Sequence, residues 1–303
     1  MKRFQAHWLK CMTAASAALG VLMVSTASQA AILTTADFEV VVEIKDSSNA
    51  GIDTVRGVLG DGQVETELIE TPPNHPFPKA GASGLASETG RTKVFAGSGA
   101  QVGEYAAVAF WEGTYTKTST NDIFKFTITP GTLLLGDGGA VGGVLRANWE
   151  LSIKLDGVSK FQSAAQIGGR GGTAADHTFR LEGEQGTRLN GAMFSTPVIV
   201  VPDVGAFVQE ASYNTASHTD FIDLSAINVG DPFTIEYIVA TFSKGLGGET
   251  IAYGHIGDPF SVGGGFSGEV VEIPEPAAGL LLVLGVMACG RRRRVALRRS
   301  SCH

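Results

Sequence analysis

The sequence predicts an all-β protein whose main part is a β-sandwich with jelly-roll-like connectivity. Three observations lead to this fold class. Short segments of alternating apolar and polar residues recur along the chain, most clearly over residues 144–155. The 303 residues include 40 glycines, many of them in turn sequences such as Asp156-Gly157. Between residues 31 and 273 no segment carries a helical apolar period over three turns, so the many short strands favour a sandwich.

The N-terminal residues have the pattern of a secretory signal peptide. Basic residues near the start precede an apolar, small-residue run over 11–24. Small residues, Ser28 and Ala30, then occupy the −3 and −1 positions of a cleavage site. We therefore expect residues 1–30 to be removed by cleavage between Ala30 and Ala31.

The first half of the exported part contains several strand-like segments. Gly60-Asp61-Gly62 separates two of them as a hairpin turn. Residues 121–129 alternate, with Ile123, Phe124, Phe126 and Ile128 expected on the inward face. We expect loops at the proline-rich 71–78 and at the Gly/Ser/Ala stretch 81–88. Before residue 130, strands are expected over 37–45, 55–59, 64–69, 102–118 and 121–129.

The second half continues the same pattern. In the segment 144–155 every second residue is apolar, and Trp149 lies on that face, so we expect it in the core. Glycine-rich loops are expected at 136–143 and 167–172. Further strands are expected over 133–135, 144–155, 177–183, 187–194, 196–201, 203–209, 220–224, 233–242 and 249–256, with a final strand region over 258–273.

The last thirty residues differ from everything before them. Pro274-Glu275-Pro276 precedes 277–290, which has fourteen residues and no charge. A helix of that length covers about 21 Å, less than a hydrocarbon core of about 30 Å. The arginines that follow can extend the span by reaching the headgroups, and they orient it with the tail in the cytoplasm. This basic cluster comprises Arg291, Arg292, Arg293 and Arg294.

This combination at the C-terminus resembles the PEP-CTERM sorting signal of exported bacterial proteins. The resemblance covers about residues 273–294 and implies that exosortase, a membrane-embedded protease/transpeptidase-like enzyme, is a partner. It further implies that Pro274, Glu275 and Pro276 form the recognition and processing motif. The protein would reside in the inner membrane before processing, and afterwards at the cell surface or in the extracellular matrix. The tail 295–303 is longer than the usual end of this signal.

Composition limits the chemistry of the exported part. The three cysteines, Cys11, Cys289 and Cys302, all lie outside residues 31–272, which therefore hold no disulfide and no thiol nucleophile. Residues 31–273 contain 14 of the 23 Lys and Arg and 29 of the 30 Asp and Glu, giving a charge near −15. This acidity argues against binding nucleic acid.

Individual residues give weak indications of a site. His75 has no spaced partner for a metal, and Ser98 lacks the strand-to-helix context of a nucleophile elbow. A pair of glycosidase carboxylates, for example Glu150 with another Glu, stays open. Four aspartates beside glycine turns are calcium candidates without the ligand spacing of a known calcium loop: Asp61, Asp137, Asp156 and Asp258.

Three functions remain open at this point. The favoured one is a non-enzymatic exported protein without cofactors, made of a signal peptide (1–30), a β-sandwich ectodomain (31–272) and a sorting signal (273–303). The second is a carbohydrate-binding module that recognises an extracellular polysaccharide through exposed aromatic residues such as Trp111, Tyr115 or Tyr213. The third is an enzyme acting on polysaccharide.

Overall fold

The computed structural model describes most of the chain between residues 31 and 273. The described ranges are 31–46, 50–70, 80–98, 102–129, 131–137, 144–170, 178–182, 193–195, 198–201, 206–214, 217–246, 251–257 and 264–273. Within them the regular elements are all β-strands, in two antiparallel sheets. The predicted all-β class is therefore confirmed. The predicted signal peptide and the predicted C-terminal helix lie outside the described residues.

One sheet has seven strands in the described part of the chain. Its central strands, β6 and β16, each have 15 residues and pair along their full length. In spatial order the strands are β11 (Thr178–Glu182), β10 (Val158–Arg170), β9 (Val144–Leu155), β16 (Pro232–Leu246), β6 (Val102–Thr116), β1 (Ile32–Asp46) and β2 (Gly51–Val58).

The second sheet has eleven strands among the described residues. Its main path runs through β12 (Met193–Ser195), β14 (Ala206–Asn214), β8 (Gly131–Asp137), β17 (Ile251–Ile256), β5 (Arg91–Gly97), β18 (Phe266–Glu272), β7 (Asp122–Ile128) and β15 (His218–Asp223). Three further strands are β3 (Gln63–Glu70) and β4 (Ala80–Ser87), which continue the sheet beyond β5, and β13 (Val198–Val201), which pairs with β14.

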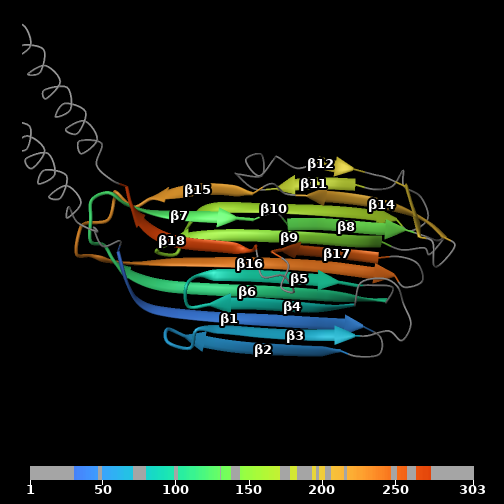
Figure 1. The fold of residues 1–303 in the computed structure, drawn as a ribbon, viewed down its shortest axis with the longest axis horizontal. Coiled ribbons are helices and arrows are strands. Elements are labelled where there is room, and N and C mark those ends of the chain that lie inside the picture. Colours follow the sequence, from blue (N-terminus) through green and yellow to red (C-terminus); the bar gives the residue numbers. More distant parts are fainter. Residues whose placement is uncertain are drawn as a thin grey trace, which may run out of the picture.

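Several strands of the second sheet lie end to end. Both β17 and β18 pair with β5, one with residues 94–97 and the other with residues 91–92. Next to them, β8 pairs with β17 and β7 pairs with β18, so β7 and β8 form a second interrupted row, as Figure 1 shows. The rows break where Thr129 and Gly265 meet: the backbone N–H of Thr129 donates to the Gly265 carbonyl at 3.0 Å.

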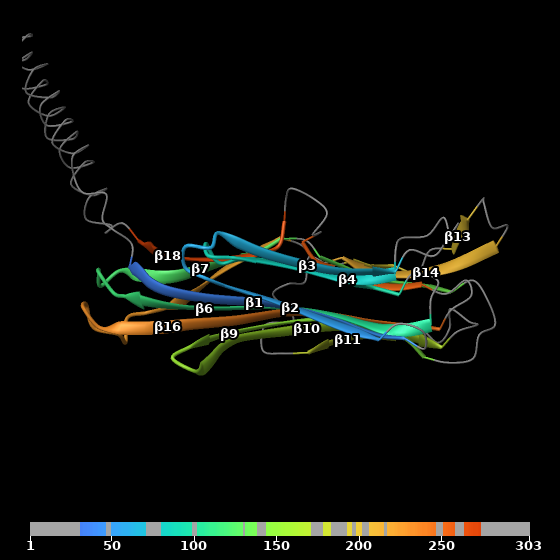
Figure 2. The same ribbon diagram turned by 90° about the horizontal axis from the view of Figure 1, so that it is seen from below.

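The two sheets pack face to face as the layers of a sandwich (Figure 2). Inward positions alternate with half-exposed ones along β6 and β16, so each strand turns every second side chain toward the space between the sheets. Trp111 stacks on Tyr237 with ring centroids 4.9 Å apart, and Tyr115 stacks on Phe233 at 5.5 Å. The largest fully buried side chains are Trp111, Trp149, Tyr105, Tyr213, Tyr237, Phe38, Phe124, Phe126, Phe233, Phe266, Ile128 and Leu133.

The last strands of the chain occupy central positions in both sheets. Strand β16 lies between β6 and β9, and β18 lies between β5 and β7. Strand β16 thus joins β6 to β9, and β18 joins β5 to β7. Completion of both sheets therefore requires the chain up to Glu272.

Two expected loops are strands instead. The stretch 81–88 was expected to be irregular, but β4 covers most of it and its side chains are buried on both faces. Its small residues allow close packing: a Cβ added at Gly84 would lie 2.5 Å from Val40 Cγ1 of the other sheet. Residues 167–170 of an expected glycine loop belong to β10 and pair with β9. Strand β5 was not expected at all.

Other boundaries shift by smaller amounts. Residues 144–155 form β9, as expected, with Trp149 in the core. Ile123 lies on the outer, half-exposed side of β7, contrary to expectation, whereas Phe124, Phe126 and Ile128 face inward. The expected strands 187–194 and 203–209 correspond to β12 and β14, whose described residues begin later in the chain.

Candidate functional site

The predicted sorting residues lie outside the described part of the protein, apart from Ala31, which is buried. These are Ala30, Pro274, Glu275, Pro276, Arg291, Arg292, Arg293 and Arg294. The described residue next to the motif is Ile273, whose N–H donates to the Asn121 carbonyl at 3.1 Å. The chain is therefore held by the β6–β7 connection one residue before Pro274. A search of the described ranges finds no helix with the length and apolar character needed to span a membrane.

The aromatic residues expected to bind sugars are not exposed. Trp111 and Tyr213 are each 1% exposed and Tyr115 is 6% exposed, because all three belong to the inner faces of their strands. Burial raises the pKa of Tyr115, and burial, with a smaller contribution from the nearby Tyr115, raises the pKa of Tyr237 well above its ordinary value. These residues form the core, so the assignment of Trp111, Tyr115 or Tyr213 as a sugar-binding surface was wrong.

The turn aspartates use their carboxylates locally where they are described. Asp61 accepts a hydrogen bond from the Val58 N–H at 2.9 Å, and Asp156 accepts one from the Thr234 N–H at 2.8 Å. The Asp156 contact ties the β9–β10 hairpin turn to β16. The Asp61 contact lies in the connection between β2 and β3, which belong to different sheets, so the hairpin expected at Gly60-Asp61-Gly62 was wrong. Asp258 lies outside the described residues, and so does the side chain of Asp137. Among the described residues there is no group of three or more His, Cys, Asp or Glu placed to hold a metal.

The residues considered for catalysis are separated from one another. Glu150 is exposed on β9, and its register partners on the two neighbouring strands are Ala164 and Ala240. Ser98 is fully buried, and its hydroxyl bonds to the backbone of Ala252.

The histidines are also dispersed. His218 Nε2 lies 3.7 Å from Asp220 Oδ2 on β15, and His255 lies on β17 beside Tyr253. His75 and His177 are outside the described ranges.

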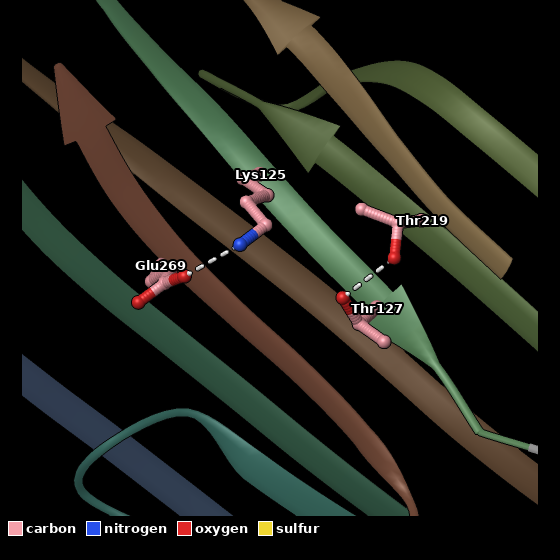
Figure 3. Close-up of polar contacts among 4 residues, drawn as sticks. All are labelled: Lys125, Thr127, Thr219 and Glu269. Carbon is pink, nitrogen blue, oxygen red and sulfur yellow. Dashed lines mark hydrogen bonds and ion pairs between the residues drawn. The ribbon is translucent and has the colours of Figure 1, made fainter. Parts of the chain in front are cut away.

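The second sheet has a polar outer surface over β18, β7 and β15, which we call the β7 outer face. Lys125 Nζ lies 3.3 Å from Glu269 Oε1, and the hydroxyls of Thr127 and Thr219 are 3.0 Å apart (Figure 3). Phe221 lies next to Lys125 in register on the edge strand and is 54% exposed. Together with Ser267, which pairs with Thr127, these residues combine hydroxyls, an ion pair and an aromatic ring.

Sequence reasoning missed the β7 outer face for a specific reason. Phe221 and Ile222 are adjacent and apolar, so the alternation in β15 does not indicate which of them points outward. In the structure Ile222 is buried and Phe221 is exposed. Phe221 is the one aromatic residue among the exposed large hydrophobic side chains of the described ranges.

Comparisons with known proteins add little. No protein-family model matches the chain, and no curated protein matches it. One solved structure retrieved is that of T=1 particles derived from infectious bursal virus. The chain is similar to it at 8% identity over 88% of this chain and 86% of that chain, with a TM-score of 0.11. A likeness this low carries no argument about fold or function.

Proposed function

We propose that the protein is an exported, non-enzymatic β-sandwich that exosortase sorts to the cell surface or extracellular matrix. In this proposal the signal peptide 1–30 directs export and Pro274-Glu275-Pro276 is the processing motif. Residues 277–290 hold the chain in the inner membrane, and Arg291–Arg294 keep the tail in the cytoplasm. The observation that carries the proposal is the order of three features at the C-terminus: the Pro-Glu-Pro motif, the apolar run and the arginine cluster.

The positions of the two ends of the sandwich support this proposal. Ile32 at the start of β1 pairs with Thr116 of β6, and Ile273 bonds to Asn121. The end of β6 and the β6–β7 connection that follows it thus hold the two ends, which lie at the same end of the sandwich (Figure 1). Signals at the two termini therefore leave the domain from one side.

The link between the sandwich and the proposed membrane segment is short. From Ile273 to Ala277 the chain advances by four residues, at most about 14 Å when fully extended. Before processing, the end of the sandwich that carries β18 would therefore lie close to the membrane surface, where a membrane-embedded enzyme reaches Pro274-Glu275-Pro276.

The test is intact-mass analysis of the protein from its host, separated into membrane, surface and medium fractions. We expect the wild-type protein to lack residues 1–30 and the arginine tail and to be found outside the inner membrane. Replacing Pro274, Glu275 and Pro276 with alanine should leave the tail attached and the protein in the membrane. Replacing Ser300 and Ser301 with alanine is the control. Normal processing of the triple variant would refute the proposal.

A jelly-roll-like connectivity is the finer part of the fold proposal. The chain changes sheet repeatedly, from β5 to β6, from β6 to β7 and from β8 to β9. It then places β16 between strands formed much earlier. Alternation between two sheets, rather than a simple meander, supports this connectivity.

A second candidate function is polysaccharide binding by the β7 outer face. The exposed ring of Phe221 offers an apolar contact surface, and the threonine hydroxyls and the Lys125–Glu269 pair offer hydrogen bonds. Sugar rings present apolar faces and hydroxyl edges, which match these groups. This surface replaces the buried aromatics as the place where a glycan would contact the domain.

Affinity electrophoresis in gels containing the host's extracellular polysaccharide tests this candidate. Phe221→Ala should reduce the retardation of the protein in the gel. We expect its dissociation constant for the polysaccharide to rise about tenfold or more, which corresponds to about 1.4 kcal/mol. Val158→Ala is the matched control, because Val158 is 58% exposed and lies on the other sheet. Unretarded wild-type protein, or equal weakening by both substitutions, would contradict the assignment.

A further inference from the structure

Two carboxylates face each other at the end of the sandwich, where the last strand stops. Asp122 begins β7 and Glu272 ends β18, and the two residues are register partners. The next pair, Asn121 and Ile273, is joined by a backbone hydrogen bond. Pair types alternate in an antiparallel ladder, so Asp122 and Glu272 form a non-hydrogen-bonded pair with Cα atoms about 4.5 Å apart and side chains close together.

Each of these carboxylates has one oxygen bound and one left over. Asp122 Oδ2 accepts hydrogen bonds from the N–H groups of Thr118 and Ser119, both at 3.0 Å. Glu272 Oε1 accepts one from the Ser119 hydroxyl at 2.9 Å. The remaining atoms, Asp122 Oδ1 and Glu272 Oε2, are buried and have no hydrogen-bond partner among the described residues. Ser119 thus bridges two carboxylates whose other oxygens are unsatisfied.

The described part of the protein supplies no cation to these two oxygens. Asp122 is 1% exposed, and neither carboxylate belongs to an ion pair within the described ranges. Buried Lys117 is near in sequence, but its ammonium donates to the carbonyls of Leu224 and Ile227 at 2.6 and 2.7 Å. Opposed like charges are destabilising, and a buried carboxylate without a counter-charge costs several kcal/mol.

We propose that Asp122 Oδ1 and Glu272 Oε2 bind a divalent cation of the calcium class. Hard cations prefer carboxylate and other oxygen ligands, which is the chemistry available here. Two carboxylates are few for such a site, so water completes the shell and the affinity is in the range of about 10⁻⁴–10⁻³ M that extracellular modules show. The bound ion joins the start of β7 to the end of β18, one residue before Pro274. Binding itself does not depend on the proposed sorting.

The experiment measures thermal unfolding of the full-length chain in detergent, once in EDTA and once in 10 mM calcium. Tryptophan fluorescence monitors the unfolding in both cases. We expect calcium to raise the unfolding midpoint of the wild-type protein by about 3–11 °C, which spans the affinity range given above. Glu272→Gln should abolish this shift. In EDTA the same variant should unfold at a higher temperature than the wild type, because the opposed charges are gone.

Glu269→Gln is the matched control, since Glu269 lies on the same strand with a side chain that is 62% exposed on the outer face. It should retain the full calcium shift. Asp122→Asn also removes a ligand, but Asp122 holds the Thr118 and Ser119 amides, so Glu272→Gln decides the result. A wild-type protein without a calcium shift, or a shift that persists in Glu272→Gln, would overturn the site.

Discussion

Gly113 on β6 provides a sharp test of how the core is packed. The indole of Trp111, two residues earlier on the same face, lies over this glycine. A Cβ at position 113 would be 2.2 Å from Trp111 Cη2 and 2.8 Å from both Cζ2 and Cζ3. The indole cannot move aside easily, because it is stacked on Tyr237 with the rings inclined by 14°.

Gly113→Ala should therefore destabilise the protein. Overpacking of a filled core costs about 1–3 kcal/mol, and the better strand propensity of alanine returns about 0.5–1 kcal/mol. The net loss of about 1–2 kcal/mol corresponds to a fall of roughly 2–8 °C in the unfolding midpoint for a domain of this size. Gly51→Ala is the matched control, because its Cβ would meet Leu68 Cδ1 at 3.6 Å, an ordinary contact.

Urea unfolding followed by tryptophan fluorescence measures both variants. The reasoning is refuted if Gly113→Ala is as stable as Gly51→Ala within about 0.5 kcal/mol. A double-mutant cycle adds a second criterion. Trp111→Leu removes the obstructing ring, so Gly113→Ala should cost clearly less in that background than in the wild type.

Two further predictions concern pH and backbone geometry. Burial raises the pKa of Tyr115 and Tyr237 above the ordinary value of 10, so the unfolded chain loses these protons first as pH rises. The free energy of unfolding should be insensitive to them below pH 10 and fall above it by about 1.4 kcal/mol per pH unit for each tyrosine. Burial also raises the pKa of Tyr213, so Tyr237→Phe should remove one tyrosine's share, about 1.4 kcal/mol per pH unit, from the slope in alkaline denaturant titrations. Gly265→Ala should cost more than Gly113→Ala in urea unfolding, because φ is +113° and the added Cβ would lie 2.4 Å from the Thr92 carbonyl oxygen.

Sequence reasoning succeeded where a strand has one buried and one solvated face. In β9 the alternation of residues 144–155 predicted six inward side chains, and all six are buried: Leu145, Ala147, Trp149, Leu151, Ile153 and Leu155. Period-2 alternation reports the two environments of a pleated strand directly. The all-β class follows from many such segments together.

The same reasoning failed where that contrast is missing. In β4 both faces are buried, so the sequence shows small residues without alternation and resembles a loop. In β15 and β7 two adjacent apolar residues, Phe221–Ile222 and Ile123–Phe124, leave the facing ambiguous. Only packing against the other sheet determined which member of each pair turns inward.

The sequence by itself determined the fold class, the main amphipathic strands and the expectation of signals at the two termini. Tertiary structure alone decided which strands became neighbours, because antiparallel pairing joins residues that are far apart in the chain. That pairing inserted β16 and β18 into the sheet centres and placed Asp122 opposite Glu272. It also buried Trp111 and exposed Phe221, since the two faces of a strand become inner and outer only when a second sheet covers one of them.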